Sequence, residues 1–310
     1  MTRRLPLQLG TRGSPLALAQ ARLVRAALAE ADADLTAEDA VEIVVVKTTG
    51  DRVQDRLLAD IGGKGLFTKE IEEGLQAGTL DLAVHSMKDM PTQLPDGLLI
   101  AAVLPRADPR DALIARGPRS IGALPRGATV GTASLRRAAQ LMAARPDLHV
   151  APLRGNVQTR LRKLEAGEVD ATFLAVAGLV RLGLGEVASA PLEPEEMLPA
   201  PAQGAIGIEC RADDADVLAL LARVDHLDTM QRITAERAFL AALDGSCRTP
   251  IAALAETAGD RLRLRGLVAS PDGRKVERIE AEGSATAAAA TGAEAGAQVR
   301  QRLGPGFFLA

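Results

Sequence analysis

A predicted helix start with two arginines in its first turn is the feature of this sequence that most directly suggests chemistry. Ser134 follows the short apolar segment 128–131 and precedes LRRAAQL, which predicts an N-cap and places Arg136 and Arg137 in the first helical turn. The dipole of a helix disfavours cations at that end and favours anions. Two arginines there are consistent with an anion bound between them and the helix N-terminus.

The same combination of a polar cap and a nearby arginine occurs twice more. Arg154 and Arg160 flank the predicted N-cap Asn156, and Arg12 precedes the predicted cap Ser14, which is followed by proline. In a chain whose formal net charge is −3, this repetition predicts a site for a ligand that carries several carboxylates or phosphates. The alternative is that these arginines form a solvated face, because arginine is common on protein surfaces.

A second candidate is HSMKDMP, which directly follows the predicted strand 80–84. It places His85, Ser86, Lys88 and Asp89 in one turn at the end of that strand. Lys88 favours the ionised form of Asp89, and an ionised aspartate facing a cleft can stabilise a cation or accept an N–H group. The alternative is an ordinary Asx-type turn that leads into the following proline.

The two cysteines have different surroundings. Cys247 stands in DGSCRTP, a loop of small and polar residues beside Arg248, which favours its thiolate and suits it for covalent attachment. Cys210 lies in the apolar run GIEC and is expected to be inert core. Two cysteines give no disulfide framework, and the three histidines lack metal-ligand spacing, so we expect no metal site.

A glycine-rich segment, GGKGLFTKE, surrounds Lys64. It lacks the spacing of a Walker phosphate loop and the hydroxyl residue after the lysine, so it is a weak nucleotide signal. A mobile lid or a further anion contact is the interpretation that its composition favours.

The composition limits the class of protein and of partner. Of the 310 residues, 47% are hydrophobic and 25% charged, as in an ordinary globular protein. Aromatic residues make up 2%, with no Trp and no Tyr, which argues against stacking on nucleic-acid bases. No apolar run approaches the roughly 20 residues that span a bilayer, and the first residues lack the apolar stretch of a secretory signal. We therefore expect a cytoplasmic enzyme without nucleic-acid or membrane partners.

Strand and helix patterns alternate over the first two thirds of the chain. This alternation predicts an α/β fold with two similar doubly wound lobes and mainly parallel sheets, followed by a smaller C-terminal α+β domain. GAIGIECR is expected to return to the sheet of the first lobe. The predicted domains are 1–104 with 203–222, then 105–202, and finally 223–310. Because ligands bind at the carboxyl ends of parallel strands, the loops that carry the candidate residues should gather there.

These segments together resemble porphobilinogen deaminase, a family of tetrapyrrole biosynthesis. The resemblance extends from about residue 9 to 256 and is weak beyond it. The segments that carry it are TRGSPLALAQ, KTTGD, GGKGLFTKE, VHSMKDMPTQLPDGL, GTASLRRAAQL, LRGNVQTRLRKL, AVAGLVRLGL, QGAIGIECR and DGSCRTPIAA.

The resemblance implies a role for each candidate residue. Cys247 would carry a dipyrromethane cofactor through a thioether, and Asp89 matches the catalytic aspartate of the family. A larger set would bind the carboxylate side chains of substrate and cofactor: Arg12, Ser14, Lys64, Ser86, Lys88, Thr132, Ser134, Arg136, Arg137, Arg154, Gly155, Arg160, Arg181 and Gln203. Three positions depart from the common pattern: Ala19, Ala133 and the PAPAQGA segment.

The activity that the resemblance implies is a transferase reaction, and we expect a monomer because the sequence has no obvious exposed apolar helix that would support a stable oligomer. Four porphobilinogen units would be joined head to tail, with loss of ammonia, onto the dipyrromethane primer, and hydrolysis would release hydroxymethylbilane. Two other functions share some of these features. A two-lobed solute-binding protein would have the same anion-binding helix starts, and a thiol hydrolase would pair Cys247 with His85.

Overall fold

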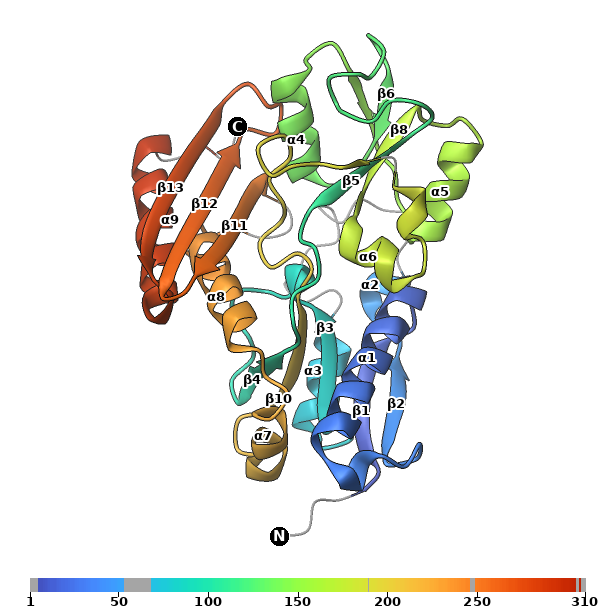
Figure 1. Cartoon of the computed structure of the whole chain (residues 1–310), viewed down its shortest axis with the longest axis vertical. Coiled ribbons are helices and arrows are strands. Elements are labelled where there is room, and N and C mark those ends of the chain that lie inside the picture. Colours follow the sequence, from blue (N-terminus) through green and yellow to red (C-terminus); the bar gives the residue numbers. More distant parts are fainter. Residues whose placement is uncertain (1–4, 53–67, 189, 246–248, 305–306, 308–310) are drawn as a thin grey trace. The chain divides into compact units, whose positions relative to one another are not determined.

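The fold is described by a computed structural model that covers residues 5–52, 68–188, 190–245, 249–304 and 307. The chain forms two compact units, each assembled from two separate stretches of sequence. Unit 1 comprises residues 1–106 and 205–230, and unit 2 comprises residues 107–204 and 231–310. Figure 1 labels the elements of both. The finer division into three domains stays a prediction.

Unit 1 is a five-stranded sheet with helices, in the strand order β2-β1-β3-β10-β4. Its strands are β1 (Leu7–Arg12), β2 (Val41–Val46), β3 (Leu82–Ser86), β4 (Leu98–Val103) and β10 (Ile206–Arg211). Its helices are α1 (Pro15–Ala31), η1 (Ala33–Leu35), α2 (Thr49–Arg52), α3 (Lys69–Gln76), η2 (Met87–Asp89) and α7 (Ala215–Leu221).

The first helix shows why these residues fold as they do. Ser14 caps α1 by accepting a hydrogen bond from the backbone N–H of Ala17 at 3.2 Å, and a proline occupies the first helical position. The apolar residues of α1 recur at helical spacing, so that Val24 and Leu28 are fully buried against Leu9 of β1. The predicted cap at Ser14 is therefore confirmed.

Unit 2 contains a second five-stranded sheet, in the strand order β7-β6-β8-β5-β9. Its strands are β5 (Asp111–Ala115), β6 (Thr129–Gly131), β7 (His149–Ala151), β8 (Ala171–Ala175) and β9 (Ala190–Pro191). Its helices are α4 (Leu135–Ala144), α5 (Val157–Glu165), α6 (Val176–Arg181) and η3 (Gly185–Val187).

The α/β class and the two similar lobes are confirmed, but the sheets are mixed where the sequence predicted mainly parallel ones. In unit 1, β1 runs parallel to β2 and β3, whereas β10 runs antiparallel to β3 and β4. In unit 2, β6 runs parallel to β7 and β8, whereas β5 runs antiparallel to β8 and β9. β10 returns to the sheet of unit 1 only after the lobe of unit 2 has been built, as the sequence predicted. It enters that sheet in the direction opposite to β3 and β4.

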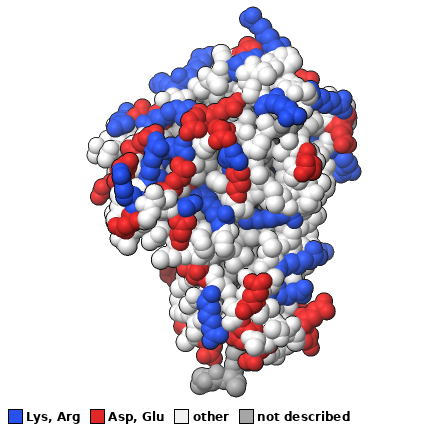
Figure 2. Space-filling model, in the orientation of Figure 1, with Lys and Arg blue, Asp and Glu red and all other residues white. Residues whose placement is uncertain are grey.

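The end of the chain adds a three-stranded antiparallel sheet to unit 2, in the order β11-β12-β13. Its elements are α8 (Leu227–Ala242), β11 (Ile251–Ala258), β12 (Arg261–Ala269), β13 (Val276–Ser284), η4 (Ala285–Ala287) and α9 (Ala288–Leu303). Residues of α8 and α9 share one buried cluster with the strands. Positive and negative side chains are intermingled on the face seen in Figure 2, and Arg263 of β12 pairs with Glu280 of β13 at 2.7 Å.

Helix α9 packs closely on α8 through glycines. A Cβ atom added at Gly292 would lie 2.0 Å from the backbone oxygen of Ala235, and one at Gly296 would lie 2.6 Å from Cβ of Ala242. The small-residue face predicted for this helix therefore has a packing role.

Gly292→Ala is expected to lower the free energy of unfolding by about 1–3 kcal/mol, because the new methyl group overlaps a backbone oxygen. The same substitution on an exposed helix face would raise stability by about 0.5–1 kcal/mol, so the sign of the change is diagnostic. Urea unfolding measures it, with the exposed Glu294→Ala on the same helix as control. A stabilised Gly292→Ala variant would contradict the close contact.

Candidate active site

The candidate residues of unit 1 meet at one edge of its sheet. Strands β1 and β3 are parallel neighbours, so their carboxyl ends, Arg12 and Ser86, lie at the same edge. A pocket of about 70 Å³ opens there, and Arg12, Ser14, Ser86 and Asp89 are all among its lining residues. The gathering of these loops that the sequence predicted is confirmed for unit 1.

The turn that carries Asp89 packs with its buried side against β10 and the residue before it, whereas Asp89 is exposed. Met87 is buried, and its backbone N–H donates to the carbonyl of Ala205 at 3.1 Å. A Cβ atom at Gly207 would lie 2.1 Å from the sulfur of Met87, so β10 needs glycine at this position. The turn therefore rests on β10 and presents Asp89 to the pocket.

Ser86 is held by a side chain that the sequence analysis did not single out. The amide nitrogen of Gln20 donates to Oγ of Ser86 at 2.8 Å, and Gln20 is buried on α1. This contact connects the helix capped by Ser14 to the end of β3. The hydroxyls of Ser14 and Ser86 are thus both placed by the first helix.

A buried cluster of titratable groups lies beside this pocket. Nε2 of His85 lies 2.9 Å from Oε2 of Glu209, and their side chains are 5% and 0% exposed. Burial raises the pKa of Glu72, and the nearby Glu209 adds to the rise, against the opposing effects of Thr68 and His85. Neither glutamate was predicted as a site residue, although a glutamate inside the apolar strand GIEC is a signal in the sequence that indicates a buried carboxylate at Glu209.

The candidate residues of unit 2 also gather at one sheet edge. Strands β6, β7 and β8 are parallel, and the segments with the predicted anion-binding residues follow their carboxyl ends. Ser134 caps α4 by accepting from the N–H of Arg137 at 3.5 Å, and Asn156 caps α5 by accepting from Thr159 at 2.9 Å. Both predicted caps are confirmed.

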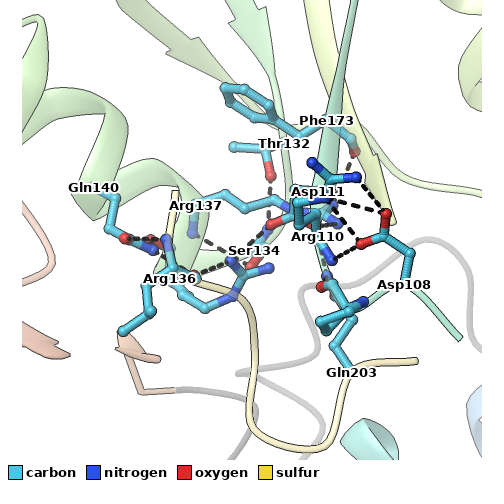
Figure 3. A network of polar contacts seen from close by, with 12 residues as sticks. Asp108, Arg110, Asp111, Thr132, Ser134, Arg136, Arg137, Gln140, Phe173 and Gln203 are labelled. Carbon is cyan, nitrogen blue, oxygen red and sulfur yellow. Dashed lines mark hydrogen bonds and ion pairs between the residues drawn. The ribbon is translucent and has the colours of Figure 1, made fainter. Parts of the chain in front are cut away.

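Arg136 and Arg137 face an anion that belongs to the chain itself. Asp111, the first residue of β5, is fully buried, and it lies at this edge because β5 runs antiparallel to β8. Its Oδ2 lies 2.8 Å from Nη1 of Arg136 and its Oδ1 lies 2.7 Å from Nη2 of Arg137. Figure 3 shows this network. The sequence predicted an anion near this pair but not an internal one.

The charges in this network depend on one another. Burial alone would raise the pKa of Asp111, but the attraction of Arg136 and Arg137 outweighs it and holds that pKa well below its usual range. Burial lowers the pKa of Arg136, and Asp111 opposes this effect. The two guanidinium groups therefore keep the Asp111 carboxylate ionised inside the protein.

The remaining predicted residues of unit 2 lie along the same edge. Thr132 is buried and its Oγ1 accepts from the N–H of Ser134 at 3.1 Å. Nε of Arg160 donates to the carbonyl of Gly155 at 2.8 Å, where the backbone has φ of 112°. Arg154 is half-buried.

Two further predicted residues of this unit are involved in contacts of segment 198–204, one that binds its backbone and one that belongs to it. Nη2 of Arg181 donates to the carbonyl of Gly204 at 2.6 Å, and burial lowers the pKa of Arg181 to about 10. Gln203 is buried and donates to Oδ1 of Asp111 at 2.9 Å. Lys88, by contrast, stands half-buried in the Asp89 turn of unit 1.

Two of the predicted site residues, Lys64 and Cys247, lie outside the described residues. Burial raises the pKa of the Cys210 thiol to about 11, which agrees with an inert core position. Within the described ranges, no group of three or more His, Cys, Asp or Glu side chains could hold a metal ion. None of the described helices has the length and apolar character needed to cross a membrane.

Comparisons with known proteins identify the family. Residues 7–219 match the family model "Porphobilinogen deaminase, dipyromethane cofactor binding domain", and residues 230–301 match "Porphobilinogen deaminase, C-terminal domain". Porphobilinogen deaminase of Paracoccus denitrificans is 58% identical over 303 residues, which cover 98% of this chain and 96% of the relative. That of Nitrobacter winogradskyi is 54% identical over 300 residues, covering 97% and 94%.

A solved structure of a putative methionine-binding lipoprotein from Bacillus subtilis matches with a TM-score of 0.44 and 14% identity, over 71% of this chain and 90% of that one. The two family models together cover residues 7–219 and 230–301, and the two relatives match over 98% and 97% of the chain. This chain therefore belongs to the porphobilinogen deaminase family, transferases that use a dipyrromethane cofactor.

Proposed function

We propose that this chain joins four porphobilinogen units head to tail, with loss of ammonia, onto a dipyrromethane primer linked to Cys247, and then releases hydroxymethylbilane by hydrolysis. The observation that carries the proposal is the unit 1 pocket, where an exposed carboxylate, Asp89, stands beside a guanidinium, Arg12, and two hydroxyls, Ser14 and Ser86. The negative charge of Asp89 and the positive charge of Arg12 in this pocket suit a ligand that has both N–H donors and carboxylates.

The donor set of the described residues fits the cofactor. A dipyrromethane has pyrrole N–H groups and acidic side chains, and it needs an acceptor for the former and cations or hydroxyls for the latter. Asp89 can accept the N–H groups, and Arg12 with Ser14 at the start of α1 can bind a carboxylate. The bound cofactor would supply a free pyrrole α-carbon as the nucleophile.

Asp89 would contribute electrostatic stabilisation. Positive charge develops on the pyrrole nitrogen when the substrate loses ammonia, and an ionised carboxylate fixed beside that nitrogen lowers the energy of the transition state. The burial of Met87 beneath the turn supports this role, because a carboxylate that is already in position needs no reorganisation during the reaction.

The anion-binding residues would hold the substrate and the growing chain. The hydroxyl of Ser86, which donates to Oε1 of Gln20 at 3.0 Å, would turn to donate to a ligand carboxylate, and Lys88 stands in the same turn. In unit 2, Thr132, Ser134, Arg136, Arg137, Arg154, Gly155, Arg160, Arg181 and Gln203 would bind further carboxylates, and Lys64 would be an additional contact. The position of the unit 2 residues beyond the carboxyl ends of parallel strands, where ligands bind in such sheets, supports this assignment.

Three finer features belong to the same proposal. They are a monomeric state, a cytoplasmic location, and the division of the chain into domains 1–104 with 203–222, 105–202 and 223–310. The alternative of a two-lobed solute-binding protein is not favoured, because the family to which the chain belongs consists of transferases. A thiol hydrolase is not favoured either, since Nε2 of His85 lies against Glu209.

The intact mass of the denatured, freshly purified protein tests the proposal. From a host that makes porphobilinogen, we expect an excess equal to two deaminated porphobilinogen units, which peptide mapping places on Cys247. Cys210→Ala is the matched control and should retain the adduct, whereas Cys247→Ser should lose it together with activity. An unmodified wild-type protein would be incubated with porphobilinogen or hydroxymethylbilane and weighed again. Continued absence of adduct and of turnover would reject the proposed function.

A further inference from the structure

We propose that Asp111 is a positioning residue for the arginine pair, and this inference rests on the proposed function. In this role, its buried carboxylate holds the guanidinium groups of Arg136 and Arg137 in the orientation that receives a ligand carboxylate. It also balances one of their two charges before any ligand arrives.

The geometry around Asp111 fixes both guanidinium groups from several directions. Besides its contact with Asp111, Nη1 of Arg136 donates to the carbonyl of Leu198 at 2.7 Å. Nη1 of Arg137 donates to the carbonyl of Phe173 at 2.9 Å. The two arginines of α4 thus connect Asp111 with the end of β8 and with the segment around residue 198, and their side chains have little freedom to turn elsewhere (Figure 3).

The segment that follows residue 198 is tied to the same carboxylate. Nε2 of Gln203 donates to Oδ1 of Asp111 at 2.9 Å and to the carbonyl of Pro109 at 2.7 Å. Gln140 of α4 completes the arrangement, because its amide nitrogen donates to the carbonyl of Leu198 at 3.0 Å and its oxygen accepts from the N–H of the same residue at 2.9 Å. The orientation of the pair is therefore set before a ligand binds.

The balance of charge explains why a carboxylate is needed at this place. The side chains of Arg136 and Arg137 are 5% and 6% exposed, and that of Asp111 is not exposed. Two buried guanidinium charges at a helix N-terminus, which is itself positive, would repel one another. One internal carboxylate compensates for one of the two charges, and the remaining positive charge favours one ligand carboxylate.

A merely structural role for Asp111 would give a different result from a positioning role. Loss of a structural residue lowers stability, but the enzyme that does fold binds its substrate normally. Loss of a positioning residue weakens carboxylate binding in the folded enzyme itself, because the guanidinium groups are no longer held in place. Measurement of the cofactor content, and of KM and kcat separately, distinguishes these cases.

The experiment compares Asp111→Asn and Asp111→Glu with wild type, and uses Leu113→Ala as the structural control. Leu113 is fully buried on the same strand and does not belong to the network, so its truncation lowers stability alone. For each protein the fraction that carries the dipyrromethane is measured by intact mass, and KM and kcat for porphobilinogen are measured on the loaded fraction.

For Asp111→Asn we expect a loaded fraction well below that of wild type and a KM raised by about tenfold or more, which corresponds to about 1.4 kcal/mol of binding, with kcat changed much less. Asp111→Glu keeps the charge and should restore loading, while its extra methylene displaces the guanidinium groups and raises KM. Leu113→Ala should keep the wild-type KM.

Unchanged loading and KM in Asp111→Asn would overturn the inference. If Asp111→Asn does not fold, Asp111→Glu decides, and a wild-type KM in that variant overturns the inference equally. Failure of the proposed function looks different, because the wild-type protein would then lack both the adduct and turnover.

Discussion

Asp89→Asn is expected to lower kcat by about 100-fold to 1,000-fold or more, with little change in stability or in cofactor content. The amide occupies nearly the same volume but has no charge to oppose the positive charge that develops on the pyrrole nitrogen. Because Asp89 is exposed at the end of η2 while the turn is anchored through buried Met87, the substitution should leave the fold intact.

Steady-state kinetics with porphobilinogen, together with intact mass, measures this effect. Asp96→Asn is the matched control, since Asp96 is also an exposed carboxylate of unit 1 and does not line the pocket, and it should have wild-type kcat. Asp89→Glu keeps the charge but moves it, so partial activity is expected. A kcat near that of wild type in Asp89→Asn would remove Asp89 from the reaction.

Arg137→Met is expected to lower the free energy of unfolding by about 1–3 kcal/mol, because it leaves the fully buried Asp111 with one guanidinium in place of two and the carbonyl of Phe173 without its donor. Methionine fills much of the space of the arginine side chain, so the loss reports mainly on these polar contacts. Urea unfolding at neutral pH measures it. Arg263→Met, which breaks the exposed pair with Glu280, should stay near wild-type stability.

The pH dependence of this difference follows from the lowered pKa of Asp111. A carboxylate with a lowered pKa contributes stability above its unfolded pKa of about 4, and this contribution is lost as the pH falls toward its folded pKa. In Arg137→Met the pKa of Asp111 should rise. Because the unfolded-state pKa of Asp111 is the same in both proteins, the stability deficit of the variant is greatest at neutral pH and narrows as the pH falls through the raised pKa of Asp111 in the variant toward its lowered pKa in the wild type. A deficit that does not change with pH would contradict an ionised Asp111.

Local rules explain which parts of the fold and of the candidate site the sequence predicts. A polar cap and the residues after it are close in sequence, so Ser14, Ser134 and Asn156 could be identified without knowing the tertiary structure. The gathering of the loops follows from strand direction, because parallel strands end at the same edge.

The partners of buried charges could not be predicted in this way. His85 and Glu209 are separated by 124 residues, and Asp111 and Arg137 by 26. An apolar strand that contains one acidic residue indicates a buried carboxylate, but it does not show which cation compensates for it. For the same reason the sequence could not show that the anion beside Arg136 is internal.

The late arrival of β10 has a consequence for the order in which this protein is made and folds. The turn that presents Asp89 rests on Ala205 and Gly207, more than a hundred residues further along the chain, and β10 lies between β3 and β4. A nascent chain that ends at residue 204 therefore has these two strands without the one that joins them. During synthesis the edges of β3 and β4 that later pair with β10 are therefore unpaired and can pair wrongly until residue 211 has left the ribosome.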